Sequence, residues 1–196
     1  VAGGEENFAG YCCTVGGQKN KARGVRGAAF GYNNDIATTS QYGFVANANN
    51  KVITNGTSVF GSNNTEIFSD INSYFANCRN NFVAGGGNKF YGRYHFIVGE
   101  NNYVHAAGRC VVGGHDNEVG ATDNTVFGEY NTVSTEPNPD GQFRENNFVG
   151  GHSNNVQGSS NLVWGPNNVI RHTGCLVKGK GLISADDSQV LFGKYN

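Results

Sequence analysis

The chain has 196 residues and a formal net charge of -1, and it contains 30 Gly, 3 Pro and no Met. This charge excludes a strongly basic nucleic-acid patch or an acidic tail, and no apolar run is long enough to span a membrane. Gly and Asn together make up nearly a third of the residues, as in turn-dense repeat proteins, whereas an aromatic content of 12% opposes disorder. The first residue is Val, so we expect a fragment of a longer chain.

An apolar residue, most often Val, recurs at steps of about seven residues along the chain. A helical heptad would be rich in Leu, Ala, Glu and Lys, whereas β-branched residues, Gly and Asn dominate here. The pattern therefore predicts short strands joined by tight turns. We call the recurring positions anchors; they are Val15, Ala22, Ala29, Ile36, Val45, Val52, Val59 and Ile67, then Val83, Phe90, Ile97, Val104, Val112, Val119, Val126 and Val133, then Val149, Val156, Val163, Ile170, Val177, Ile183 and Val190.

The position two residues before each anchor, which we call the slot, holds Asn in about half of the repeats and a small residue in most others. Residues two apart on a strand point to the same side, so we expect slot and anchor to face inward together. Stacked Asn side chains can then bond between coils of a thin core. Gly often follows two residues after the anchor, where a corner would require a positive φ.

The outward positions between slot and anchor alternate in character from one heptad to the next. One row is mostly apolar, and a second outward row just after the anchors extends this apolar face; its members are Phe30, Phe60, Val98, Phe127, Trp164 and Leu191. The other row carries Lys21, Asp35, Lys51, Glu66, Lys89 and Glu118, which we expect to be exposed. The true repeat is therefore about 14 residues, two short strands back to back. This predicts an all-β solenoid of about a dozen coils in a single domain over 1–196, with insertions at about 68–80 and 134–146. The apolar row must be buried, most simply against copies of the chain. Its candidate interface residues are Phe44, Phe82, Phe96, Phe148, Leu162 and Leu176.

Inward Val and Asn, corner Gly and an apolar outer row resemble the head domains of trimeric autotransporter adhesins, and related β-rolls occur in phage tail fibres. The resemblance covers the chain from about Val15 onward. It implies a left-handed parallel β-roll of 14–15-residue two-strand coils, assembled as a homotrimer. The chain departs from those heads in preferring Asn where they often use Ser or Ala. The Asn-x-Val-x-Gly sequence pattern is also similar to that of ryegrass antifreeze proteins, which form a monomeric left-handed β-roll.

The chain shows no catalytic or metal-binding motif. Its five Cys are odd in number and lack paired spacing, and three of them, Cys13, Cys110 and Cys175, occupy inward slots as buried thiols. The five His lack zinc-ligand spacing, the Gly runs lack a phosphate-loop context, and no carboxylates are paired in a recognisable cleft. We therefore expect no enzyme activity, no metal and no cofactor.

The two insertions, Ser69–Asn80 and Ser134–Asn146, both follow a strand of the polar row and should leave the roll at the same edge. Insertions in repeat proteins often gather on a binding face, although loops that vary in sequence and length without a function explain them equally well. Aromatic and Arg side chains dominate recognition energetics. The candidate receptor-binding residues are Tyr74, Phe75, Arg79, Phe143 and Arg144.

The leading functional prediction is a structural, receptor-binding fibre segment that attaches to a cell surface through a glycan or protein receptor. It belongs to a virion appendage or a bacterial surface, and involves no nucleic acid and no membrane insertion. Reduced cysteines favour the phage appendage, which is assembled in the cytosol. The alternative is an ice-binding β-roll, although ice faces need flat ranks of small residues such as Thr. A hexapeptide-repeat acyltransferase is a third reading, but its coils need eighteen residues.

Overall fold

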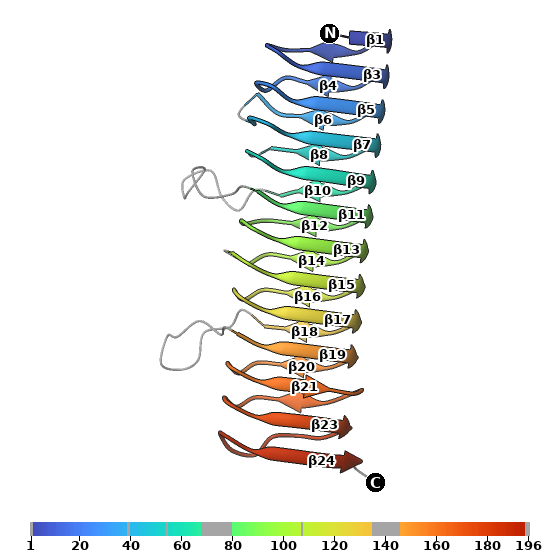
Figure 1. Cartoon of the computed structure of the whole chain (residues 1–196). Coiled ribbons are helices and arrows are strands. Elements are labelled where there is room, and N and C mark those ends of the chain that lie inside the picture. The colour runs from blue at the N-terminus through green and yellow to red at the C-terminus, as the bar shows by residue number, and fades with distance from the viewer. Residues whose placement is uncertain are drawn as a thin grey trace. The chain divides into compact units, whose positions relative to one another are not determined.

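The computed structural model describes residues 2–38, 40–53, 55–67, 80–106, 108–134 and 146–194. The chain divides into two compact units, unit 1 (Val1–Glu100) and unit 2 (Asn101–Asn196), and each is a parallel β-solenoid (Figure 1). Together they contain about 12 turns of about 14 residues, and no helix occurs among the described residues. The all-β solenoid expected from the sequence is confirmed, while a single domain over 1–196 stays a prediction.

Each unit contains a sheet of mostly five-residue strands, the long-strand sheet, and a sheet of two-residue strands, the short-strand sheet. Neighbouring strands are parallel and belong to successive coils. In unit 1 the long-strand sheet comprises β1 (Ala2–Glu5), β3 (Thr14–Gln18), β5 (Ala28–Tyr32), β7 (Phe44–Ala48), β9 (Ser58–Ser62), β11 (Phe82–Gly86) and β13 (Phe96–Glu100). Its short-strand sheet comprises β2 (Phe8–Ala9), β4 (Lys21–Ala22), β6 (Asp35–Ile36), β8 (Lys51–Val52), β10 (Thr65–Glu66) and β12 (Lys89–Phe90).

Unit 2 repeats the same two-sheet arrangement. Its long-strand sheet comprises β15 (Val111–His115), β17 (Thr125–Glu129), β19 (Phe148–His152), β21 (Leu162–Trp164), β23 (Leu176–Lys180) and β24 (Val190–Lys194). Its short-strand sheet comprises β14 (Tyr103–Val104), β16 (Glu118–Val119), β18 (Thr132–Val133), β20 (Asn155–Val156) and β22 (Val169–Ile170).

The anchors of successive coils lie in register and form the core. Val45 pairs with Val59, fourteen residues later, and nearly all anchors are fully buried. Val52 is 0% exposed while its neighbour Lys51 is exposed, which confirms the inward and outward assignment made from the sequence. A repeat of two heptads therefore sets which residues face inward, because side chains alternate strictly along each strand.

The slot before each short strand holds an Asn, which is buried in every coil except that of Asn7. Each of these Asn side chains bonds to its counterpart in a neighbouring coil, and together they form an Asn ladder. The Asn34 side-chain amide donates to Asn20 Oδ1 at 2.9 Å, to the Phe30 carbonyl at 3.0 Å and to the Asn47 carbonyl at 2.7 Å. The Asn34 backbone N–H also donates to Asn20 Oδ1, at 3.1 Å. Each side chain thus satisfies backbone groups that the corner would otherwise leave buried and unpaired. In unit 1 the ladder comprises Asn7, Asn20, Asn34, Asn50, Asn64 and Asn88, and in unit 2 it comprises Asn102, Asn117, Asn131, Asn154 and Asn168.

The corner that follows the core of each long strand depends on Gly. Gly85 has a φ of 117°, and a Cβ there would lie 1.9 Å from the carbonyl oxygen of Gly99 in the next coil. Such a position excludes other residues through both backbone conformation and close approach. Asn47 takes this place in one coil, with a φ of 80°. The expected positive φ is confirmed at most corner Gly residues, although Gly24 lacks it.

Slots before the long strands are more varied, and most hold Cys, Gly, Thr, Asn or His. Cys13, Cys110 and Cys175 are each at most 2% exposed, which confirms buried thiols at these slots. The Cys110 thiol donates to the Ala121 carbonyl at 3.1 Å, and burial raises its pKa to about 11. His95 is likewise 2% exposed, with Nε2 2.9 Å from the Tyr91 carbonyl oxygen. These side chains are parts of the core.

Three anchor assignments are wrong by one residue. The register pairs Glu66 with Phe90, so Glu66 faces inward at 2% exposure, and the expectation that Glu66 is exposed and Ile67 is the anchor is wrong. The carboxylate is accommodated because Oε2 accepts the Ile53 backbone N–H at 2.7 Å. Ile183 and Val190 are also outward, at 61% and 62% exposure, and the inward residues beside them are Ser184 and Leu191.

Candidate functional site

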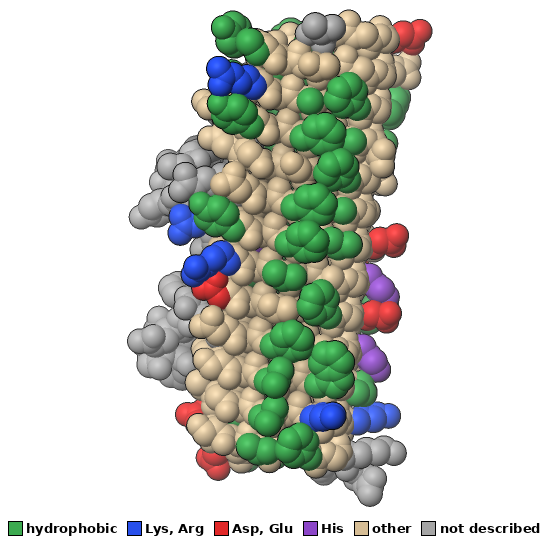
Figure 2. Space-filling model, viewed as in Figure 1, with side chains coloured by type: hydrophobic (Ala, Val, Ile, Leu, Met, Phe, Trp, Pro, Cys, Tyr) green, Lys and Arg blue, Asp and Glu red, His purple; other side chains and the backbone are tan. Residues whose placement is uncertain are grey.

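The outer face of the long-strand sheet carries one large apolar residue in nearly every coil. In unit 1, Phe30 follows its anchor, Phe44 precedes its anchor, and Phe60 follows again. Small residues occupy the complementary positions, so Phe30 pairs with Ala46 and Phe60 with Ala46 from the other side. Because coils are only about 4.8 Å apart, this zigzag lets large rings fit side by side. Figure 2 shows the resulting apolar stripe in green.

The rings of this face contact one another from coil to coil. In unit 1 the ring centroids lie 6.2 Å apart for Phe30–Phe44, 5.2 Å for Phe44–Phe60, 5.7 Å for Phe60–Phe82 and 5.1 Å for Phe82–Phe96. Such pairs contribute about 0.5–1.5 kcal/mol each. The ladder therefore stabilises the stacking of coils, yet Phe96 remains 47% exposed. Unit 2 has the same type of ladder, in which Phe148 lies between Phe127 and Trp164.

The six candidate interface residues all lie on this outer face. Phe44, Phe82 and Phe96 belong to β7, β11 and β13 of unit 1, and the remaining three belong to β19, β21 and β23 of unit 2. Each precedes its anchor by one residue. The second outward row was also recognisable from the sequence, except in the last coil, where Phe192 rather than Leu191 pairs with the outward Lys178.

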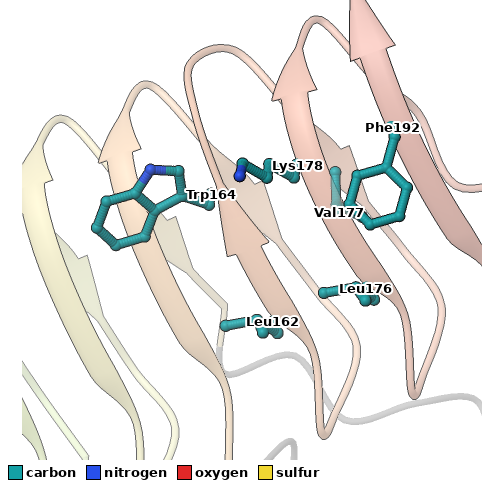
Figure 3. Close-up of a pocket in the computed structure, with 6 residues that line it drawn as sticks. All are labelled: Leu162, Trp164, Leu176, Val177, Lys178 and Phe192. Atoms are coloured by element: carbon teal, nitrogen blue, oxygen red, sulfur yellow. The ribbon is translucent and has the colours of Figure 1, made fainter.

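The apolar face of unit 2 is hollowed over β21, β23 and β24. A pocket of about 240 Å³ is lined by Leu162, Trp164, Leu176, Val177, Lys178 and Phe192. Figure 3 shows the Trp164 and Phe192 rings on either side of Lys178, as their register requires. The Leu side chains supply an apolar floor, and the two rings supply walls. The hollow suits an apolar side chain from another molecule better than a charged ligand.

An ionisable cluster borders the apolar face in unit 2. His115 Nδ1 lies 2.9 Å from Asp116 Oδ2, and Nε2 lies 2.9 Å from Glu129 Oε1 in the next coil. Hydrogen bonding to Asp116 is the largest cause and raises the pKa of His115; desolvation opposes this effect, and hydrogen bonding to Glu129 raises the pKa further. The Tyr130 ring meets the imidazole edge-on at 5.3 Å. Both ring nitrogens of His115 therefore have carboxylate partners within the cluster.

The outer face of the short-strand sheet differs sharply, because in unit 1 it is basic. Lys21, Lys51 and Lys89 are exposed, as expected from the sequence. The outward acid of that row, Asp35, forms a bidentate ion pair with Arg23, whose Nη2 lies 2.7 Å from Asp35 Oδ1. In the same row of unit 2, the exposed Glu118 is 3.4 Å from His105.

Exposed Tyr and Arg side chains occupy several of the corners that precede long strands, and they were not identified from the sequence. Arg26 Nη1 donates to the Tyr42 hydroxyl at 2.6 Å, and the guanidinium lies 5.6 Å from the ring centroid. Tyr11, Tyr42 and Tyr94 are 75%, 57% and 45% exposed. The signal available in the sequence was the residue directly before the slot, which is Arg26, Tyr42 or Tyr94 in three coils of unit 1. In the structure, Arg26 and Tyr42 have a positive φ at this position.

The five candidate receptor-binding residues, Tyr74, Phe75, Arg79, Phe143 and Arg144, lie outside the described residues. Within the described ranges, no group of three or more His, Cys, Asp or Glu side chains is placed to hold a metal ion. No helix in that part of the chain is long and apolar enough to cross a membrane.

Comparison with known proteins adds no family assignment. No protein-family model matches the chain, and no curated protein or solved structure matches it.

Proposed function

We propose that the chain is a structural segment of a homotrimeric fibre that attaches to a cell surface, as a phage tail appendage or a bacterial adhesin head. In this proposal the solenoid is left-handed, and the apolar faces of the long-strand sheets pack around a threefold axis. The observation that carries it is the continuous outward ladder of large apolar side chains in each unit.

The exposed apolar area supports burial of this face in an assembly. In unit 1, Phe30, Phe60, Phe82 and Phe96 are between 37% and 47% exposed. At roughly 200 Å² per side chain, these four rings alone leave on the order of 300 Å² of apolar surface open. These four rings alone therefore reach the lower end of the range of about 300–600 Å² for the largest apolar patch of a typical monomer, and such patches are often functional. Unit 2 adds Phe127, Leu162, Trp164 and Phe192, each between 43% and 63% exposed.

Copies of the same chain, arranged as a homotrimer, are expected to cover this face because it is repetitive and carries few charges. Closed rotational symmetry lets one surface cover itself without leaving an unsatisfied copy at either side. The hollow beside Trp164 and Phe192 would receive a side chain of a neighbouring subunit. Lys178 can extend its ammonium group to solvent while its methylene stem covers apolar surface.

Sedimentation tests the assembly. The wild-type chain should sediment as a trimer at micromolar concentration, and Phe96→Asp should shift it to monomer. Truncating a ring that is 47% exposed removes about 2 kcal/mol of transfer free energy per subunit. The buried carboxylate adds a cost of several kcal/mol. Phe8→Asp is the matched control, because Phe8 is 56% exposed on the outer row of the short-strand sheet. A stable wild-type monomer or dimer would refute the threefold assembly.

Attachment is expected to involve the two insertions. Inward residues and the apolar face of the repeats contribute to coil stacking and subunit contacts, whereas loops are free to vary, as recognition requires. A trimer presents each insertion three times, which converts weak single-site affinity into avidity. We would replace 68–80 and 134–146 with short Gly-Asn corners and measure attachment to host cells. Undiminished attachment by a trimer that still folds would contradict this part of the proposal.

Ice binding is less well supported by the outward rows. The described outer faces carry Phe on one sheet of unit 1 and Lys on the other, rather than flat ranks of small residues. A measurement of thermal hysteresis distinguishes the two functions.

A further inference from the structure

The outer row of the short-strand sheet in unit 1 places a lysine in every second coil. The register pairs Lys21 with Asp35, Asp35 with Lys51, Lys51 with Thr65 and Thr65 with Lys89. At about 4.8 Å per coil, successive lysines are roughly 10 Å apart. This separation equals the Debye length of about 10 Å at 0.1 M salt, so the lysines repel one another little.

The positive charge of this row is not cancelled nearby. Asp35 is neutralised by Arg23, and Glu66, the other acid on these strands, faces inward. None of Lys21, Lys51 and Lys89 forms an ion pair within the described part of unit 1. The row therefore presents three available ammonium groups in a line along the coil axis.

The corner between a short strand and the next long strand supplies exposed aromatic rings in unit 1. Tyr11 and Tyr94 are exposed, and Arg26 is held against the Tyr42 ring. Exposed tyrosines offer flat apolar faces with a polar tip, which suit the ring face and hydroxyl groups of a sugar. Because this corner follows the short strand in each coil, unit 1 has exposed rings in the same coils as the spaced cations or in adjacent ones.

From this arrangement we propose that unit 1 binds a linear acidic polysaccharide that carries one carboxylate on every second sugar. The inference rests on the proposed role in attachment and names the receptor chemistry. Charge spacing decides against nucleic acid, whose phosphates follow at about 3.4 Å along each strand and are neutralised by several closely placed cations. Three lysines roughly 10 Å apart match a polymer of lower charge density.

The site is confined to unit 1. The equivalent row of unit 2 reads Tyr103, Glu118, Thr132, Asn155 and Val169, with no lysine. This contrast also supplies a way to separate a specific site from a general effect of net charge.

The test uses the full chain and hyaluronan oligosaccharides, which carry a carboxylate on alternate sugars, with neutral dextran and a DNA duplex as comparison ligands. Immobilised hyaluronan should bind, and raising salt from 50 to 200 mM should weaken binding several-fold. The variant Lys21→Gln/Lys51→Gln/Lys89→Gln should weaken it at least about tenfold. Because all three side chains are exposed, the variant should fold as the wild type does, and circular dichroism checks this.

The charge-matched control is Arg171→Gln/Lys180→Gln/Lys194→Gln, which removes three cations from unit 2 and should bind as the wild type does. Equal loss in the control, equal binding of dextran, or tighter binding of DNA through the same lysines would overturn the inference. Sedimentation of the same samples separates the two proposals. A trimer that does not bind hyaluronan refutes only this inference, and a monomer that binds it through the lysine row refutes only the assembly.

Discussion

Replacing Asn50 with Ala should reveal how strongly the Asn ladder stabilises the solenoid. The Asn50 amide donates to Asn34 Oδ1 at 3.0 Å, to the Ala46 carbonyl at 3.1 Å and to the Gly61 carbonyl at 2.6 Å. Its Oδ1 accepts the backbone and side-chain N–H groups of Asn64, both at 3.0 Å. The substitution therefore removes five side-chain hydrogen bonds at a position that is 1% exposed.

At about 1 kcal/mol per bond the loss is roughly 5 kcal/mol, and it becomes about 3–5 kcal/mol if water enters the space left behind. The free energy of unfolding should be measured by urea titration followed by circular dichroism. Amide hydrogen exchange gives a local readout, because the Asn64 N–H loses its acceptor and should exchange faster.

The matched control is Asn49→Gly, one residue earlier. Asn49 is exposed, bonds Asn33 and Asn63 at 3.0 and 3.3 Å, and has a φ of 56° that Gly tolerates. We expect this change to cost less than about 1 kcal/mol. If Asn50→Ala destabilised the protein no more than Asn49→Gly does, the ladder would not be a major source of stability.

Gly85→Ala should destabilise the fold by about 3 kcal/mol or more, since φ is 117° and the Cβ would clash, whereas Gly86→Ala, with no atom nearer than 3.7 Å, should stay within about 0.5 kcal/mol; similar thermal melts for the two would contradict the corner geometry. Iodoacetamide at pH 8 should label the exposed Cys12 and leave Cys110 unmodified, because burial raises the Cys110 pKa to about 11; comparable labelling by mass spectrometry would show that the core opens. His115→Gln should lower the free energy of unfolding most below pH 6.5, the ordinary pKa of a histidine, because hydrogen bonding to Asp116 raises the pKa of His115 in the folded state. The difference in unfolding free energy between variant and wild type should vanish as the pH rises through that raised pKa. A difference that grows with pH instead would contradict the assignment.

The interaction surfaces were only partly accessible from the sequence. Both outward apolar rows could be assigned, because alternation along a strand fixes the side of each residue. The interleaving of Phe44 between Phe30 and Phe60 depends on the register between coils, and the pocket beside Lys178 depends on strand β24 being one residue out of the expected phase. The lysine row was expected to be exposed, but its regular spacing emerged only from the pairing.

The sequence by itself determined the two-heptad period, the inward Val and Asn, and the all-β solenoid, because these follow from local alternation and turn chemistry. Tertiary structure decided the choice between Glu66 and Ile67, adjacent residues of which hydrophobicity favours the wrong one. The carboxylate faces inward because the neighbouring coil supplies the Ile53 N–H, and because the next coil aligns Phe90 with it. A one-residue change of register inverts which side chains are buried, and only pairing between coils fixes that register.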